Sequence, residues 1–396
     1  MRIPRMVAAG AAVAGLVLGA GAAQARTEIQ WWHALGGKLG EKVAAIAEDF
    51  NKSQGDYEVK AVYKGTYAET MTGAIAAFRA RQQPHIVQAG EPFDPKSYLP
   101  AVVGYYTTTQ GQMLSFPFNS STPVMYVNKN AFQKAGLDPA SPPRTWPELE
   151  DAAKKLLAAG YPCGFTTQWP SWIQLENFSA WHNLPLGTQA NGFGGLTTEL
   201  VFNKTPAVDH LAKLGEWQKA KIFQYGGRRG DADPKFFNQE CPIFFASSAA
   251  YAAIKANAKD FEFGIGMLPY WPNIEGAPQN SIIGGASLWV LRGHKPDDYK
   301  GVAKLFSYLS RPEVQADWHQ FTGYLPITPA AYELSRSQGF YERNPGFDVS
   351  IKQMTAKPPT ESSKGLRFGS MVQIRDIIEE EMEGVFSGQK TPKDAY

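Results

Sequence analysis

Segments with strand periodicity alternate with segments of helical periodicity along this chain, and that alternation constrains the fold more than any other feature. Polar and apolar residues alternate around 29–31 and over 57–63, and apolar residues with helical spacing lie between them at 39–50. A strand follows at 86–88 after a further helical stretch with three apolar residues on one face: Met71, Ile75 and Phe78. The pattern predicts an α/β fold with mainly parallel sheets flanked by helices, and ligands binding beyond the carboxyl ends of the strands.

The same alternation resumes further along the chain. A strand at 124–127 precedes a helix that opens at Thr145 and Glu148, which have the spacing of a capping box. Later, a strand at 287–291 precedes a helical stretch that must stop before the proline of 311–312. Both blocks are therefore expected to be α/β.

The length of the chain bears on its domain organisation. A chain of 396 residues exceeds what one hydrophobic core usually supports, so two lobes are expected. No repeat and no Gly/Ser-rich linker marks a simple division, which favours lobes that exchange chain. We predict that 26–123 and 272–326 form lobe 1, and that 124–271 and 327–396 form lobe 2.

The first 25 residues have the organisation of a secretory signal peptide. Basic Arg2 and Arg5 precede an apolar stretch at 7–18, and the small residues Ala23 and Ala25 then provide an A-x-A-like cleavage site. We predict cleavage after Ala25 and a periplasmic location, because the apolar stretch is shorter than a spanning helix requires.

Composition argues against several classes of partner. The net charge is only +2 and the basic residues are dispersed, so neither nucleic acid nor an anionic membrane is an expected partner. Cys163 and Cys241 could form a disulfide or remain two buried thiols. The six histidines are scattered singly, no spacing resembles a metal site, and no cofactor is expected.

Enzymatic function finds little support in the sequence. A secreted glycoside hydrolase needs a carboxylate pair, and no spacing selects one among the candidates Glu176, Glu199, Asp231 and Asp233. The G-x-S-x-G, P-loop and H-E-x-x-H motifs are all absent. A hydrolase remains the alternative class.

Three clusters of small residues beside apolar runs are better candidates for binding. They lie at 119–122, 246–248 and 284–287, where hydroxyls and backbone N–H groups could hold phosphate oxygens. Trp169 and Trp172 lie close together in an expected loop, where they could either stack on a polyol or pack in the core.

Six runs of the sequence match one known family in order along the chain: 63–67, 117–123, 172–181, 282–290, 322–328 and 364–367. On these runs the chain resembles the periplasmic sn-glycerol-3-phosphate-binding proteins of ABC importers, within the maltose-binding-like group. The resemblance extends from about Ile29 to the end of the chain.

The resemblance implies two α/β lobes with a ligand in the cleft between them, and a monomer without catalytic residues. It implies that the protein delivers sn-glycerol 3-phosphate, or a glycerophosphodiester such as glycerophosphocholine, to inner-membrane permease subunits with a cytoplasmic ATPase. A sugar-binding relative is the nearest competing interpretation. The family's ligand contacts correspond here to Tyr67, Ser121, Ser247, Gly285, Tyr324 and Arg375, with Trp169 and Trp172 as an aromatic wall. Arg375 is expected to present a charge-assisted fork to the phosphate.

The sequence departs from the family in two places. After 86–88 the family continues with an aromatic residue, an acidic ligand residue and a helical segment, whereas here 89–94 follow at once. The resemblance therefore implies a shorter first lobe that lacks this acidic contact. At the end of the chain, 391–394 resembles a helix start, but Tyr396 follows so soon that no stable helix is expected.

Overall fold

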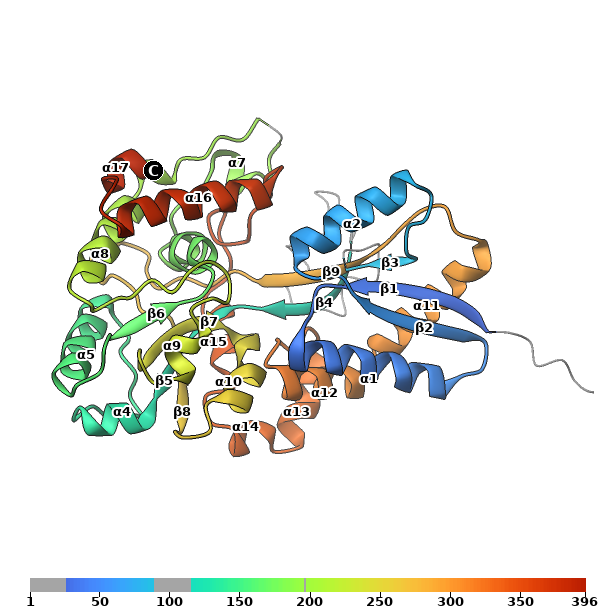
Figure 1. Cartoon of the computed structure of the whole chain (residues 1–396), viewed down its shortest axis with the longest axis horizontal. Coiled ribbons are helices and arrows are strands. Elements are labelled where there is room, and N and C mark those ends of the chain that lie inside the picture. Colours follow the sequence, from blue (N-terminus) through green and yellow to red (C-terminus); the bar gives the residue numbers. More distant parts are fainter. Residues whose placement is uncertain (1–25, 89–114, 196) are drawn as a thin grey trace, which may run out of the picture.

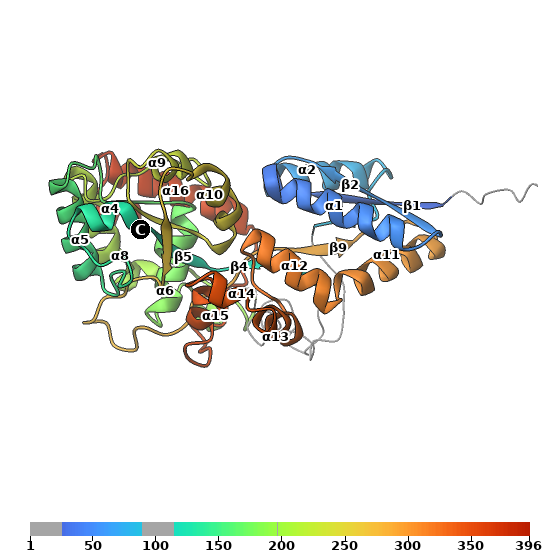
Figure 2. The same ribbon diagram turned by 90° about the horizontal axis from the view of Figure 1, so that it is seen from below.

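The computed structural model describes residues 26–88, 115–195 and 197–396, which form two lobes, each built on its own sheet (Figure 1). The same separation is visible from below, where strand β4 and the start of β9 lie between the lobes (Figure 2). The predicted signal peptide and the departure at 89–94 lie outside the described residues. Within the described part of the chain, no helix has both the length and the apolar character needed to cross a bilayer.

The first lobe contains a five-stranded sheet in the order β2-β1-β3-β9-β4. Its core joins Ile29, Phe116 and Leu305, which are all fully or almost fully buried. The strands are β1 (Thr27–His33), β2 (Tyr57–Tyr63), β3 (Ile86–Val87), β4 (Phe116–Ser121) and β9 (Gly284–Val290). The accompanying helices are α1 (Gly37–Ser53), α2 (Tyr67–Arg79), α11 (Pro296–Leu309) and α12 (Pro312–Thr322). A further helix, α13 (Pro329–Ser337), packs against α12.

The second lobe contains a four-stranded sheet in the order β6-β7-β5-β8. Its core is rich in aromatic residues, including Trp146, Phe165 and Trp217. The strands are β5 (Pro123–Asn128), β6 (Phe165–Thr167), β7 (Ile243–Ser247) and β8 (Phe263–Gly266). The helices that matter here are α5 (Trp146–Ala158), α8 (Ala207–Lys219), α9 (Asp233–Phe237), α10 (Tyr251–Asn257) and α16 (Met371–Phe386).

Both sheets are mixed, so the prediction of mainly parallel sheets is wrong. In the first sheet β1 runs parallel to β2 and β3, but β9 is antiparallel to both β3 and β4. In the second sheet β5 is antiparallel to both of its neighbours. The reason is the crossing between lobes: β4 leaves the first sheet and continues through Thr122 into β5, and β9 returns in the opposite direction (Figure 1). The α/β prediction itself is confirmed, and the residue boundaries proposed for the lobes stay a prediction.

Local signals in the sequence predicted most individual elements well. Strand β2 has the predicted bounds 57–63, and α11 ends at Leu309, before the proline that starts α12. The capping box of α5 is present, because Thr145 Oγ1 accepts from the Glu148 N–H (3.3 Å) and Glu148 Oε2 accepts from the Thr145 N–H (3.0 Å).

Two expectations about helices need correction. The apolar face of α2 does not face a core, since Met71, Ile75 and Phe78 are 45%, 46% and 50% exposed. At the other end of the chain, a short helix α17 (Pro392–Ala395) does form, capped by the Thr391 side chain. It packs against α8 and α16, and tertiary contact therefore stabilises a helix too short to persist alone.

A disulfide joins Cys163, which precedes β6, to Cys241, which precedes β7. The Cα atoms are 4.9 Å apart and the two residues are 78 positions apart in the sequence. Of the two alternatives that the sequence left open, the structure therefore has the disulfide. It links the starts of two adjacent parallel strands in the second lobe.

Candidate functional site

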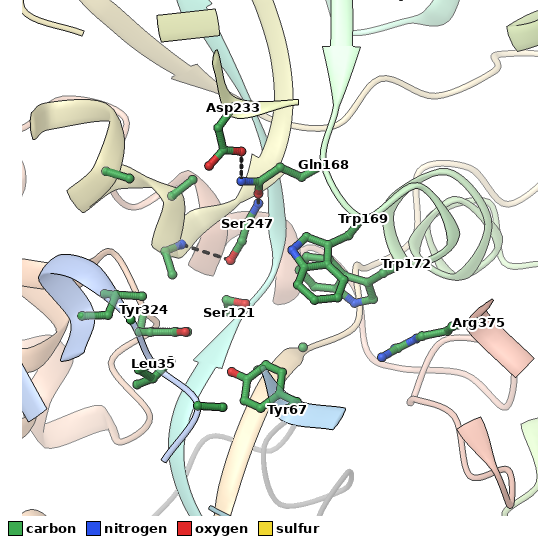
Figure 3. Close-up of a pocket in the computed structure, with 18 residues that line it drawn as sticks. Leu35, Tyr67, Ser121, Gln168, Trp169, Trp172, Asp233, Ser247, Tyr324 and Arg375 are labelled. Carbon is green, nitrogen blue, oxygen red and sulfur yellow. Dashed lines mark hydrogen bonds between the residues drawn. The ribbon is translucent and has the colours of Figure 1, made fainter. Parts of the chain in front are cut away.

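A cavity of about 340 Å³ lies between the lobes and is lined by residues of both (Figure 3). Its size is within the range of small-molecule sites. All eight residues predicted to contact the ligand line this one cavity: Tyr67, Ser121, Trp169, Trp172, Ser247, Gly285, Tyr324 and Arg375. Their convergence is a structural fact, whereas their contact with a ligand stays a prediction.

The first-lobe wall is held by hydrogen bonds and stacking. Tyr67 is the first residue of α2, directly after the Thr66 cap, and its hydroxyl accepts from Asn119 Nδ2 (2.9 Å). Burial raises the pKa of Tyr67, so the hydroxyl keeps its proton and can donate to a ligand. Tyr324 stacks on Trp318 with a 4° interplanar angle, which fixes its ring against the first-lobe core.

Two glycines allow close packing at the cavity, Gly285 between two strands of the first-lobe sheet and Gly284 against the second-lobe Trp172. Gly285 has φ +99°, and an added Cβ would lie 1.8 Å from the carbonyl oxygen of Asn119. At Gly284, an added Cβ would lie 2.4 Å from the Trp172 ring. The 284–287 cluster therefore needs glycine for close packing between β9, β4 and the tryptophan wall.

The tryptophans come from an unusual segment of the second lobe. Trp169 has φ +39°, a left-handed value that costs a non-glycine residue about 1–3 kcal/mol. Its N–H donates to the Arg229 carbonyl (2.9 Å), and Trp172 begins a π-helical turn, Trp172–Asn177. This strain is maintained at the cavity wall, which fits a functional role for the two indoles.

Ser247 lies where β7 ends and a short 3₁₀ turn, Ser248–Ala250, begins. Its Oγ accepts from the Ala249 N–H (3.2 Å). Because that oxygen is already an acceptor, its hydroxyl proton can be donated into the cavity. The Ser247 side chain in the 246–248 cluster thus caps the turn through its oxygen, and its hydroxyl proton is available to a ligand.

Arg375 is held by a carboxylate that the resemblance did not assign to the site. Its Nε and Nη2 donate to Glu176 Oε1 (2.6 Å) and Oε2 (2.7 Å), and the Glu176 side chain is completely buried. The two Arg375 N–H groups expected to bind a phosphate together therefore bind the Glu176 carboxylate in this structure. A guanidinium has five N–H groups, so a phosphate contact would use its other donors.

Helix α16 tethers the tryptophan segment twice. Besides the Arg375–Glu176 pair, Glu379 Oε1 accepts from the Ser171 hydroxyl (2.9 Å) one helical turn further along. Burial raises the pKa of Glu379, and the Ser171 hydrogen bond opposes that shift. The second-lobe wall is consequently anchored on one rigid helix.

Sequence reasoning missed two further polar residues of the cavity, Gln168 and Asp233. Asp233 accepts a hydrogen bond from Gln168 Nε2, and burial raises the pKa of Asp233 to about 6. The sequence offers Asp233 only as one of four candidate hydrolase carboxylates, and it is the one of those four that lines the cavity. Nothing in its spacing indicated this, because the fold brings it to Gln168 from 65 residues away.

One group of side chains with metal-ligand chemistry lies elsewhere, although the sequence suggested none. His85, His294 and Asp298 have ligand atoms within 4.8 Å of one another on the first lobe. However, the Gln30 N–H donates to His85 Nδ1 (3.0 Å), and burial lowers the pKa of His85. The neutral ring therefore carries its proton on Nε2, which faces Asp298 and leaves no lone pair there for a metal.

Comparison with known proteins shows which protein family has this sequence. The family described as bacterial extracellular solute-binding protein matches residues 45–348, which is most of the chain. This chain belongs to the bacterial extracellular solute-binding proteins.

Curated solute-binding relatives are similar over nearly their whole length. The chain is 49% identical to the sn-glycerol-3-phosphate-binding periplasmic protein UgpB of Salmonella typhimurium, over 95% of this chain and 91% of the relative. The protein of the same name from Pectobacterium atrosepticum is 48% identical, over 98% of this chain and 92% of the relative.

Solved solute-binding structures share the two-lobed fold. UgpB from Mycobacterium tuberculosis in complex with glycerophosphocholine superimposes with a TM-score of 0.74 at 19% identity, covering 94% of this chain and 96% of that one. Maltose-bound MalE3 from T. maritima gives a TM-score of 0.76 at 20% identity, covering 93% and 97%. The predicted two-lobed fold is confirmed, and membership in a family of binding proteins supports the prediction of a non-enzymatic role.

Proposed function

We propose that this chain is the substrate-binding component of an ABC importer, which captures sn-glycerol 3-phosphate in the cavity between its lobes. The observation that carries the proposal is the 49% identity, over 95% of the chain, to periplasmic proteins named for that ligand. Relatives with that name support the periplasmic location, and delivery to permease subunits with an ATPase follows from the importer role.

The chemistry of the cavity supports a small phosphate ester. Arg375 supplies a positive charge, and the hydroxyls of Ser121, Ser247 and Tyr67 supply neutral donors elsewhere on the cavity wall. The two indoles provide apolar faces against which the C–H groups of a glyceryl chain can pack. A cation, a set of hydroxyl donors and an aromatic wall are what the binding of a polyol phosphate requires.

Glycerophosphodiesters are the second candidate ligand class. A solved structure with the same fold holds glycerophosphocholine, although its 19% identity supports the fold and not the ligand. The two classes share the glyceryl group and a phosphate, and differ in the charge and the substituent of that phosphate. Competition between them will decide which one the cavity prefers.

Denaturant unfolding of the mature chain in the presence of each candidate tests the proposal. sn-Glycerol 3-phosphate at about 100 times its Kd should raise the free energy of unfolding by about 2.7 kcal/mol. Glycerol and inorganic phosphate, each with only half of the recognised chemistry, should raise it far less at the same concentration. Equal stabilisation by glycerol and by the ester would contradict a phosphate-specific site.

A further inference from the structure

Asp233 is an acidic residue of the cavity for which the proposed binding set has no role. It begins α9 on the second lobe, and its Oδ1 accepts from Gln168 Nε2. Gln168 Oε1 in turn accepts from the Ser247 N–H (3.2 Å), so Asp233 is linked through one amide to a predicted ligand contact. Figure 3 shows the three side chains in a row on the cavity wall.

The second oxygen of Asp233 is not used within the protein. Oδ2 makes no hydrogen bond to any residue of the described ranges, while the carboxyl group lines the cavity. Arg375 lies on the other side of the two indoles from Asp233 (Figure 3). The cavity therefore has a cationic side and, across the tryptophan wall, a side with an unused acceptor.

We propose that Asp233 is a specificity-determining residue, whose carboxylate accepts a hydrogen bond from a hydroxyl of the ligand's glyceryl group. The inference rests on the proposed function and identifies what distinguishes a polyol phosphate from other phosphate esters at this site. An ionised carboxylate only accepts hydrogen bonds and repels phosphate. It therefore favours the orientation with the phosphate near Arg375 and the hydroxyls near Asp233.

The ionisation of Asp233 should make the affinity for the ligand depend on pH. Burial raises its pKa to about 6, the negative charge of Asp231 adds to the rise, and the Gln168 hydrogen bond opposes it. The other titratable groups lining the cavity are Arg375, which stays charged, and the phenols of Tyr67 and Tyr324, which stay neutral near pH 7. Because the ionised form accepts the hydroxyl, affinity should rise as pH rises through 6.

The first test compares two ligands with the same carbon chain. sn-Glycerol 3-phosphate carries two hydroxyls, and n-propyl phosphate carries none. By titration calorimetry at pH 7.5, Asp233→Asn should weaken binding of the glycerol ester by about 10-fold or more, the effect expected for one hydrogen bond to a charged group. Binding of propyl phosphate should be unchanged or tighter, because only a repulsive charge is removed.

Asp231→Asn is the matched control, since Asp231 is exposed and does not line the cavity. It should leave the affinity for both esters within about 2-fold at pH 7.5. Thermal melts of both variants establish that each is folded. Equal weakening of both esters by Asp233→Asn would indicate a purely structural role and overturn the inference, as would no weakening of either.

The second test uses the unaltered protein, so it does not depend on a variant that folds. Glycerophosphocholine is the probe, because a phosphodiester has no second ionisation near pH 6, unlike a monoester. Its Kd should be about 10-fold weaker at pH 5 than at pH 7, and Asp233→Asn should remove most of that dependence. A flat profile, or tighter binding at pH 5, would contradict the inference. Failure of the wild type to bind either ester or diester would instead reject the proposed function.

Discussion

Replacing Arg375 by alanine should weaken binding of sn-glycerol 3-phosphate by at least about 100-fold, as expected when a charge-assisted contact to phosphate is lost. It should also lower the free energy of unfolding by about 3 kcal/mol, because the completely buried Glu176 carboxylate loses its partner. We place the effect at the lower end for buried pairs, since the Arg375 side chain is 30% exposed. Calorimetry measures the first effect and urea unfolding the second.

Two companion variants separate these effects. Arg375→Ala combined with Glu176→Gln removes the unpaired charge, so stability should largely recover while binding stays lost. Arg375→Lys keeps the charge but cannot hold Glu176 with a planar fork, and it should bind more weakly than wild type. Unchanged affinity in Arg375→Ala would rule out the phosphate role, whatever happens to stability.

Replacing Gly285 by alanine should be strongly destabilising, because an added Cβ comes closer to another atom here than at any other described glycine. The residue has φ +99°, and the new Cβ would meet the Asn119 carbonyl oxygen at 1.8 Å, so strands β4 and β9 must separate locally. We expect a loss of about 3 kcal/mol or more in the free energy of unfolding, from strain and overpacking together. Ligand binding should fall with it, since Ser121 and Tyr67 depend on β4 and Asn119.

Other glycines provide graded controls for this variant. Gly388 has φ +79° but open space around its Cβ position, so Gly388→Ala should cost only about 1–2 kcal/mol, from backbone strain alone. Gly55 has neither a left-handed φ nor a neighbour within 4 Å, and Gly55→Ala should be nearly neutral. If Gly285→Ala unfolds no more readily than Gly388→Ala, the close approach of β9 to β4 is not what requires glycine.

Local sequence signals predict individual helices and strands well, but they predict poorly how the strands pair in the sheets, and the reason is physical. Periodicity and caps depend on residues within a few positions, which is why 57–63 and the Thr145 cap were found. Strand direction in a sheet depends on where the chain re-enters it. No pattern in the residues near β9 shows that this strand returns from the second lobe, so the sequence does not predict the mixed sheets.

The candidate site was predicted through resemblance more than through chemistry. The small-residue clusters and the paired tryptophans pointed to binding, but only the ligand-contacting positions of the similar family selected the eight residues that the structure brings to one cavity. The partners that hold those residues were missed. Glu176 lies 199 positions from Arg375, and Asp233 lies 65 from Gln168, distances at which no pattern in the sequence connects two residues.

Titration calorimetry of the mature, cooperatively folded chain is the most direct test of its role as a phosphate-ester-binding protein. With sn-glycerol 3-phosphate, glycerol and maltose as ligands, we predict one site per chain that takes the ester, and no measurable heat from glycerol or maltose. Tight binding of maltose would instead identify a sugar-binding protein. A folded chain that does not bind the ester would contradict the proposed function, and the fold would then indicate ancestry alone.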